Sequence, residues 1–313
     1  MDFLSTFITV LIVVVLAVPG YALRKAKILP DGSTGVLAGL LLYISQPGLM
    51  AASFLNKEFK PSMLINFGWV ILFAVALIFL VYFAAKLIFF RCRDEAARRA
   101  CVACSYLGNV GFMGIPVMQM LFPGVQELVL YTAVYNIAFN AMTWTLGIYS
   151  VTGNRKSVNP LKIILNPPTI ATIVVLPLFF CNVPVPEQVV TPIEYLGNMT
   201  LPLSMVILGI RLADMHPLRL VNDVKTYVAS AAKLILSPLL SLAVLVAVNA
   251  IVPIDRYVIV ALYVIAAMPT ASSVLNFAEM FGGDCDTAAA TTLMSTLLCI
   301  VTIPVLMLLL EVV

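Results

Sequence analysis

Two short stretches of this sequence combine helix-breaking residues with polar side chains. The first is Gly108–Pro116, in which three glycines and a proline are poor helix formers. The second, Ala267–Asn276, contains Pro269 and then three hydroxyl side chains: Thr270, Ser272 and Ser273. An interruption within an apolar helix frees backbone N–H groups, and N–H groups at the start of a half-helix attract anions. The two stretches therefore predict a binding site for a small anion.

The predicted binding residues lie at these two interruptions and on helices expected to face them. Asn109 and the backbone N–H groups around Val110 and Thr270 are expected to hold a carboxylate, and Pro116 and Pro269 are expected to keep the interruptions open. The other predicted binding residues are Gly111, Ser272, Ser273 and Asn276, with Gln46 and Thr200 facing the site from other helices. The predicted helix-breaking positions are Gly108, Gly114, Pro47 and Pro202.

Packing is the alternative role for these residues. A glycine-rich face lets membrane helices approach closely, and a single intramembrane proline is usually a kink. Asn109 lies about 15 Å from the helix end at Arg98, near the midplane, where an amide is costly for packing alone. Asn136 and Asn140 share one helix face, and hydrogen bonding between helices is favoured for them. Lys233 is expected to extend to the cytoplasmic surface.

The elements that position these residues must be membrane-spanning helices. Of the 313 residues, 62% are hydrophobic and 11% are charged, and the mean hydropathy is +1.07. Soluble domains are about 45–50% apolar and about 25% charged. The composition excludes a soluble globular domain, a disordered chain and a disulfide scaffold. The net charge of +3 is too small to indicate nucleic-acid binding.

Apolar runs separated by proline, glycine or charged residues predict an all-α polytopic membrane protein with ten transmembrane helices. The helices are expected at roughly 4–23, 34–55, 63–90, 98–121, 127–150, 161–181, 192–211, 226–250, 257–280 and 287–310. Thirteen of the eighteen Lys and Arg residues fall in or beside alternate loops on one face. Basic loops are typically cytoplasmic, so both termini are expected outside the cell membrane.

The chain is expected to contain two inverted five-helix repeats. The Phe-x-Gly pairs at Phe122 and Phe281 are 159 residues apart, and Pro47 and Pro202 are 155 apart. The repeats span 1–151 and 161–313, joined by a short cytoplasmic linker at 152–160. Five crossings reverse the orientation of the second copy, which is a common plan of secondary transporters. The matched interruptions are therefore expected to lie where two broken helices cross.

Other kinds of site find little support in the sequence. Cys101 and Cys104 form an isolated C-x-x-C without further ligands, so no metal or cofactor is expected. No Asp or Glu lies within several residues of either interruption, and no hydrolase or protease motif is present. An enzymatic activity is therefore not expected.

Three groups of residues together resemble the auxin efflux carrier family, in its bacterial branch described as malonate or malate permeases. They are Gly108–Pro116, the stretch from Tyr135-Asn136 to Trp144-Thr145-Leu146-Gly147, and Pro269-Thr270-Ala271 with Ala278-Glu279 and Gly282-Gly283-Asp284. The resemblance implies a fold similar to bile acid:sodium symporters. The first, second, sixth and seventh helices would form a scaffold, and the third to fifth and eighth to tenth a moving transport domain. Sodium-coupled relatives carry an acidic residue near the second interruption, which is lacking here.

The resulting hypothesis is a transporter of small organic anions, such as mono- or dicarboxylates, working by alternating access. A sodium-coupled symporter of a bulkier anion and a non-transporting membrane receptor are the alternatives. Matched interruptions near the midplane favour transport, because a receptor needs no symmetric cavity. The sequence leaves open the substrate, the direction, the driving ion and the oligomeric state, a homodimer included.

Overall fold

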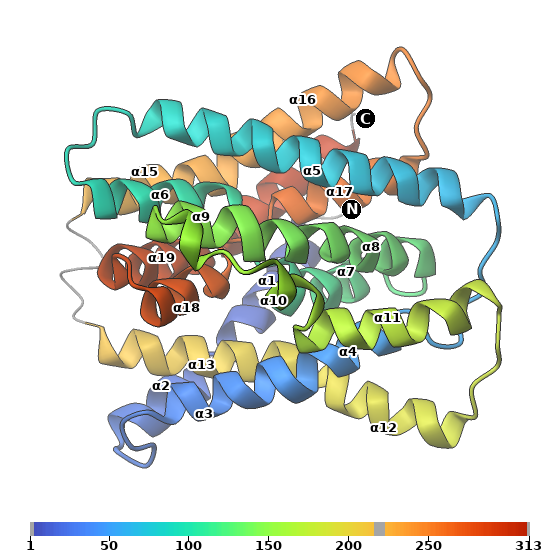
Figure 1. Ribbon diagram of the computed structural model, residues 1–313, viewed down its shortest axis with the longest axis horizontal. Helices are drawn as coiled ribbons and strands as arrows, with labels where there is room; N and C mark the ends of the chain where they lie inside the picture. The colour runs from blue at the N-terminus through green and yellow to red at the C-terminus, as the bar shows by residue number, and fades with distance from the viewer. Residues whose placement is uncertain (1–2, 216–222, 312–313) are drawn as a thin grey trace.

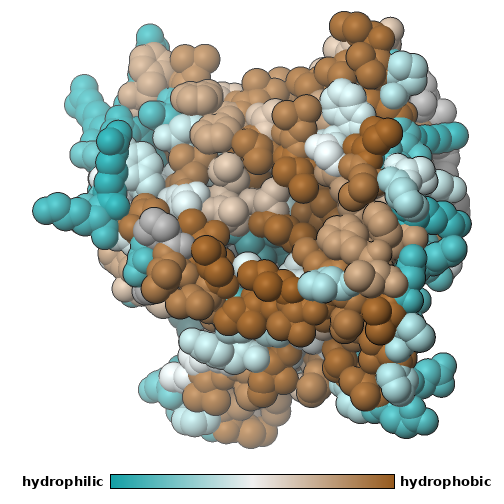
Figure 2. Space-filling model, turned by 45° about the vertical axis from the view of Figure 1, so that its right-hand side comes forward, coloured by the Kyte–Doolittle hydropathy of each residue, from teal (hydrophilic) through white to brown (hydrophobic). Residues whose placement is uncertain are grey.

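A computed structural model describes residues 3–215 and 223–311 of the chain, and its regular elements are helices (Figure 1). The extended pairing within these residues is limited to an isolated antiparallel bridge between Gly108 and Thr270. Figure 2 shows hydrophilic side chains gathered at two opposite ends of the molecule, with a hydrophobic surface between them. Large apolar side chains such as Ile65 and Leu87 lie exposed on that surface. An exposed apolar band of this kind is the surface of a polytopic membrane protein.

Six helices within the described residues are long and apolar enough to cross a membrane. They are α1–α2 (Phe3–Val15, Val18–Lys25), α3–η1–α4 (Ser33–Leu40, Leu41–Ser45, Gln46–Ala52), α5 (Met63–Ile88), α12–α13 (Glu187–Asn198, Thr200–Asp214), α15–η5–α16 (Val224–Ala231, Ala232–Leu236, Ser237–Asn249) and α19 (Cys285–Met307), which continues into η6 (Leu308–Glu311).

The remaining helices are interrupted, short or less apolar. α6 (Glu95–Tyr106) is separated from η2 (Val110–Gly114) and α7 (Ile115–Leu121), and α17 (Arg256–Ala266) is separated from α18 (Ser272–Phe281). The run α8–η3–α9 (Gln126–Met142, Thr143–Gly147, Ile148–Thr152) is continuous, and η4 (Arg155–Ser157) follows it. α10 (Pro160–Ile164) and α11 (Pro167–Phe180) replace the single helix expected at 161–181, because Asn166 begins a new helix before Pro167 and Pro168.

Loops gather at the two opposite ends of the molecule. The turns that follow α2, α5 and α18 lie at the left of Figure 1, and those after α4, α11 and α16 lie at the right. The left end therefore carries basic residues such as Lys25 and Arg93, whereas the right end carries the few basic residues near Lys57 and Arg256. The division of loops into a basic and a less basic end agrees with the charge pattern of the sequence.

Three of the prolines in the apolar helices are accommodated by π-helical turns rather than by breaks. Pro47, Pro116 and Pro238 each occupy the second position after a π-helix, namely η1, η2 and η5. A proline ring clashes with the carbonyl four residues before it, and a wide turn relieves this clash. Pro202 lies in the first turn of α13, where a missing N–H costs little.

Three of the predicted helix-breaking positions are therefore corrected. Pro47, Gly114 and Pro202 all lie within helical backbone, whereas Gly108 lies in a true interruption. The break in 98–121 falls at residues 107–109, upstream of Pro116, because the π-helix absorbs the effect of that proline.

One prediction about charge is wrong. The Lys233 side chain does not extend to the cytoplasmic surface but is only 1% exposed. Its amino group donates a hydrogen bond of 2.7 Å to the carbonyl of Ala266, at the end of α17. The side chain is therefore directed into the protein, toward the interruption in the second half of the chain.

Glycines bring two pairs of helices into backbone contact. A Cβ placed on Gly209 of α13 would lie 1.9 Å from the carbonyl oxygen of Ala17, and one on Gly20 of α2 would lie 2.1 Å from that of Val206. Likewise, a Cβ on Gly197 of α12 would lie 2.7 Å from the backbone nitrogen of Leu49 in α4. α2 and α13 run side by side at the lower left of Figure 1. We call the α2–α13 and α4–α12 contacts the glycine-packed interface.

Candidate functional site: the crossing of two interrupted helices and its cavity

Two interrupted helices meet inside the molecule, and each satisfies backbone groups that the other leaves free. The Asn109 N–H donates to the carbonyl of Pro269 at 2.7 Å, and the Ala271 N–H donates to the carbonyl of Leu107 at 2.9 Å. These two bonds frame the bridge between Gly108 and Thr270. Unwound backbone inside a membrane protein is tolerated only where protein or a lined cavity satisfies it. The pairing of residues 107–109 with 269–271 supplies that satisfaction, and we call it the crossing.

The crossing uses two of the N–H groups that were expected to hold a carboxylate. The Val110 N–H donates to the carbonyl of Gly108 at 2.9 Å, and the Thr270 N–H donates to the hydroxyl of Ser295 at 3.1 Å. The Thr270 hydroxyl donates to the carbonyl of Cys104 at 2.9 Å, near the end of α6. Thr270 therefore holds the crossing together instead of facing a ligand.

Other N–H groups at the crossing have no acceptor in the described part of the chain. Those of Gly111 and Phe112 begin the η2–α7 half-helix, and that of Ser273 lies in the first turn of α18. The N-terminal turn of a helix presents donors and partial positive charge. Of these three donors, Gly111 and Ser273 belong to predicted binding residues, whereas Phe112 does not.

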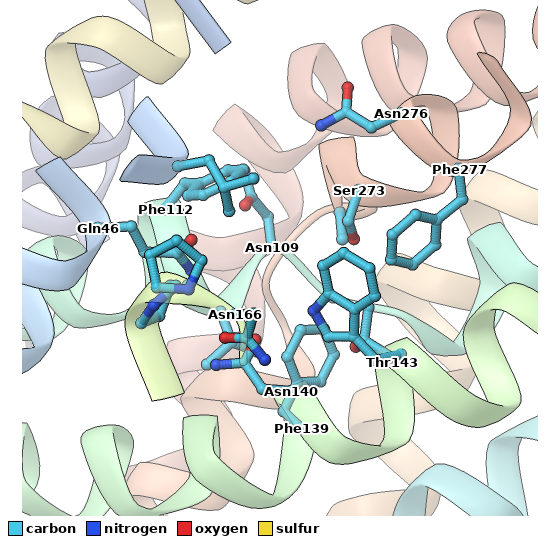
Figure 3. Close-up of a pocket in the computed structure, with 18 of the residues that line it drawn as sticks. Gln46, Asn109, Phe112, Phe139, Asn140, Thr143, Asn166, Ser273, Asn276 and Phe277 are labelled. Carbon is cyan, nitrogen blue, oxygen red and sulfur yellow. The ribbon is translucent and has the colours of Figure 1, made fainter. Parts of the chain in front are cut away.

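A cavity of about 280 Å³ lies against these half-helix starts (Figure 3). Its polar lining consists of uncharged amides and hydroxyls: Tyr43, Gln46, Asn109, Asn140, Thr143, Asn166, Ser273 and Asn276. Its apolar lining includes Phe112, Phe139, Trp144, Phe277 and Met280. The described residues that line it include no charged side chain. The cavity can therefore surround a ligand that has both a hydrogen-bonding group and an apolar body.

Asn109 is the buried amide at the centre of this arrangement. Its residue is 3% exposed, and it lines the cavity. Figure 3 shows it between Gln46 on one side and Ser273 on the other. The Ser273 and Thr143 hydroxyls are buried without a hydrogen-bond partner. Buried polar groups normally have partners, so a group of unsatisfied ones around a cavity indicates a ligand.

A glycine allows another helix to reach the site. A Cβ on Gly111 would lie 2.5 Å from the Nε2 atom of Gln46 and 3.5 Å from the Oδ1 atom of Asn136. Gln46 belongs to α4, which is also part of the glycine-packed interface. The absence of a side chain at Gly111 is what brings the Gln46 amide beside the crossing.

Aromatic rings form one wall of the cavity. The ring centroids of Trp144 and Phe277 are 5.2 Å apart in an edge-on arrangement, and Figure 3 shows Phe277 beside Ser273. Phe277 also lies within 3.7 Å of the position of a Cβ on Gly147. An aromatic wall excludes water and strengthens hydrogen bonds made beside it.

Behind Asn276, an arginine joins α13 to α18. The Arg211 guanidinium donates to the Oδ1 atom of Asn276 at 2.8 Å and lies 3.3 Å from a carboxylate oxygen of Glu279. The Arg211 side chain is only 12% exposed, whereas that of Glu279 is half exposed. Arg211 is thus already paired with a carboxylate, and it also bonds a residue that lines the cavity.

The cavity brings together some of the predicted binding residues. Those that line it are Gln46, Asn109, Val110, Gly111, Ser273 and Asn276. Those outside its lining are Pro116, Thr200, Pro269, Thr270 and Ser272. Thr200 is fully buried with an unpartnered hydroxyl, but it does not face the cavity.

Sequence reasoning missed several lining residues. Asn140 was assigned to packing, and the helix start at Asn166 was not recognised, although Asn-Pro-Pro is a helix-start pattern. The aromatic residues resemble any other apolar positions in a hydrophobic chain, so nothing in the sequence distinguishes them. Their role depends on the arrangement of helices around the crossing.

Comparisons with known proteins agree with this architecture. The sequence pattern of a family described as "Membrane transport protein" matches residues 5–307. An uncharacterized transporter, MJ1031, from Methanocaldococcus jannaschii is 28% identical over 214 residues, which are 65% of this chain and 68% of that protein.

Proposed function

Because the chain belongs to the membrane transport protein family, with its match extending over residues 5–307, we propose that it is a secondary transporter of small organic anions. This is the family that the sequence motifs of the crossing indicate by resemblance. The mono- or dicarboxylate substrate and the transport mechanism are the parts of the proposal that follow from the site.

The buried amide of Asn109 in the cavity lining carries the proposal. It lies beside the free N–H groups of Gly111, Phe112 and Ser273, and all four residues line one cavity. A carboxylate accepts several hydrogen bonds, and N–H donors at helix starts stabilise its charge without a full counter-charge. The absence of acidic residues from the described lining favours an anion over a cation.

In the proposed mechanism, the crossing and the helices around it move as a transport domain against a scaffold. We assign ten spans, arranged as inverted repeats of 1–151 and 161–313. The 152–160 linker lies in the cytoplasm and both termini lie outside the cell membrane in this assignment. The cavity lies between the two groups of helices, since Gln46 and Asn166 contribute from the scaffold. The Arg211–Glu279 pair would have to separate when the transport domain moves.

Uptake into proteoliposomes tests this function. The purified protein should accumulate radiolabelled mono- or dicarboxylates faster than protein-free vesicles and faster than vesicles holding an Asn109→Ala variant. Replacing sodium by potassium should leave the rate nearly unchanged, because no carboxylate lies among the described residues of the cavity. Saturable binding without accumulation would instead indicate a receptor.

Cysteine labelling tests the orientation. In a cysteine-free background, a cysteine at position 155, in the linker at the basic end, should resist an impermeant thiol reagent added to intact cells. A cysteine at position 57, in an exposed loop at the other end, serves as the control and should label readily. The reverse pattern would invert the assigned topology.

A further inference from the structure

A buried lysine lies beside the crossing, outside the lining of the ligand cavity. Lys233, in the π-helix η5, is among the largest fully buried side chains of the described residues. Its Nζ atom donates to the carbonyl of Ala266 at 2.7 Å and lies 3.5 Å from the hydroxyl of Ser237. A Cβ on Gly108 would lie 3.1 Å from its Cε atom and 3.3 Å from Nζ. The amino group therefore bonds the second interrupted helix and lies beside Gly108 in the interruption of the first.

The place of this amino group is defined by two half-helix C-termini. α6 ends at Tyr106, immediately before its paired segment of the crossing, and α17 ends at Ala266, two residues before its own. The last carbonyls of a helix lack partners and carry partial negative charge. Here the Thr270 hydroxyl satisfies the Cys104 carbonyl of α6, and the Lys233 amino group satisfies the Ala266 carbonyl of α17. The two ends are satisfied by different chemistry: a neutral hydroxyl at one and a lysine at the other.

Among the described residues, no acidic side chain pairs with the amino group or lines the space beside it. A small void of about 20 Å³, room for about one water molecule, lies beside it. Its polar lining within the described residues consists of Tyr106, Tyr135, Ser237 and Ser241, and no carboxylate is included. Backbone carbonyls and hydroxyls are the ligands that surround a bound alkali cation in transporters with broken helices. Lys233 places a covalently attached cation among ligands of this kind.

We propose that the Lys233 ammonium group is the resident cation of the crossing, in the place where a coupling cation would bind between the two half-helix C-termini. The assignment of the cation rests on the contacts of Lys233 alone. Its consequence, that anion movement needs no sodium, rests on the proposed transport function. Truncation of this side chain should leave a vacant site for a monovalent cation or a small alkylammonium ion.

Chemical rescue of thermal stability tests the proposal without any transport assay. Lys233→Ala should melt at a lower temperature than the wild type in choline chloride, because the Ala266 carbonyl loses its donor. Methylammonium or sodium chloride should raise the melting temperature of this variant by about 3 °C or more relative to choline chloride. The wild type and the surface variant Lys86→Ala, whose lysine lies over the Tyr82 ring, should not distinguish the three salts.

Two further variants distinguish the contribution of the Lys233 charge from that of its hydrogen bond. They also keep the proposal testable if Lys233→Ala does not fold. Lys233→Gln keeps a donor without charge, and Lys233→Arg keeps the charge. We expect the Gln variant to lose at least about tenfold in uptake rate and the Arg variant to retain more. The proposal would be overturned if Lys233→Gln kept the stability and uptake rate of the wild type. It would also be overturned if the melting temperature of Lys233→Ala did not depend on the salt, or if sodium stabilised the wild type. If the wild type transports no anion, the proposed function fails, and the thermal data still decide the role of Lys233.

Discussion

The crossing and the glycine-packed interface use opposite means to hold helices together. At the α2–α13 contact, glycines remove side chains so that backbone meets backbone, and a Cβ on Gly209 would lie 1.9 Å from a carbonyl oxygen. At the crossing, backbone and side-chain hydrogen bonds join the interrupted helices, and beside it the Thr143 and Ser273 hydroxyls have no hydrogen-bond partner. Shape dominates the first region, and hydrogen bonding dominates the second.

This difference suggests a division of labour. A close-packed interface offers no alternative arrangement at low cost, because protein interiors tolerate little change in volume. Unsatisfied polar groups around a cavity can instead gain partners when a ligand binds. A change of volume at the interface should therefore reduce stability, whereas a change of polarity in the cavity should reduce ligand affinity.

The largest effect is expected at the interface. Gly209→Val should destabilise the protein by about 3 kcal/mol or more, because the added atoms meet the Ala17 and Tyr21 backbone, which cannot move aside. Thermal denaturation of detergent-purified protein measures this loss. Gly39→Val is the matched control, since a Cβ on Gly39 meets nothing within 4 Å. Equal stability of the two variants would show that the α2–α13 contact can accommodate a larger side chain, contrary to its backbone distances.

At the cavity, Asn109→Ala should weaken substrate binding rather than folding. The loss of a hydrogen bond to a charged group costs about 1.5–3 kcal/mol, or roughly ten- to a hundredfold in Kd. Binding of a labelled anion and the melting temperature are measured on the same sample. A lower melting temperature with unchanged affinity would assign Asn109 to packing.

The substitution Thr270→Val tests whether Thr270 stabilises the crossing or binds a ligand in the cavity. It removes the donor to the Cys104 carbonyl, so we expect a loss of about 1–2 kcal/mol in stability and little change in affinity. Thr145→Val is the control, because the Thr145 hydroxyl bonds only carbonyls of its own helical run. A loss of affinity without loss of stability would return Thr270 to the binding site.

The smallest effect concerns the pair that joins α13 to α18. Glu279→Gln should change stability by less than about 1 kcal/mol, because the Glu279 side chain is half exposed. It should change the rate of uptake a few-fold, since the pair joins helices that would move apart in the proposed mechanism. Glu58→Gln, in an exposed pair with Lys60, is the control. Unchanged uptake in Glu279→Gln would remove this pair from the mechanism.

Much of the fold could be predicted from local features. Long apolar runs predict helices because lipid leaves backbone groups no other partners, and the interruptions near Asn109 and Pro269 follow from glycine and proline content. The helix start at Asn166 could also have been recognised from its Asn-Pro-Pro pattern. Helix breaks could not be predicted reliably from the prolines, because a π-helical turn can accommodate a proline ring that otherwise breaks the helix.

The candidate site could be predicted only in part. Asn109 and Ser273 were identified because polar residues beside helix breaks are unusual in an apolar chain. Asn140 could not be assigned to the cavity, since an amide on a helix face serves packing or binding equally well. Thr270 is a predicted site residue because backbone N–H groups near it are expected to be free, but its N–H donates to Ser295 and its hydroxyl donates to a carbonyl 166 residues away in the chain.

By itself, the sequence determined that the chain lies in a membrane, where its helices run and where two of them are interrupted. Each of these properties depends on the residue and its near neighbours: apolar transfer energy, the missing N–H of proline and the freedom of glycine. Tertiary structure alone decided which groups at the crossing are satisfied and which remain open. Lys233 shows the difference, because its amino group is held by Ala266, 33 residues away. Hydrogen bonds between distant segments depend on how helices pack, and packing is a property of the whole chain.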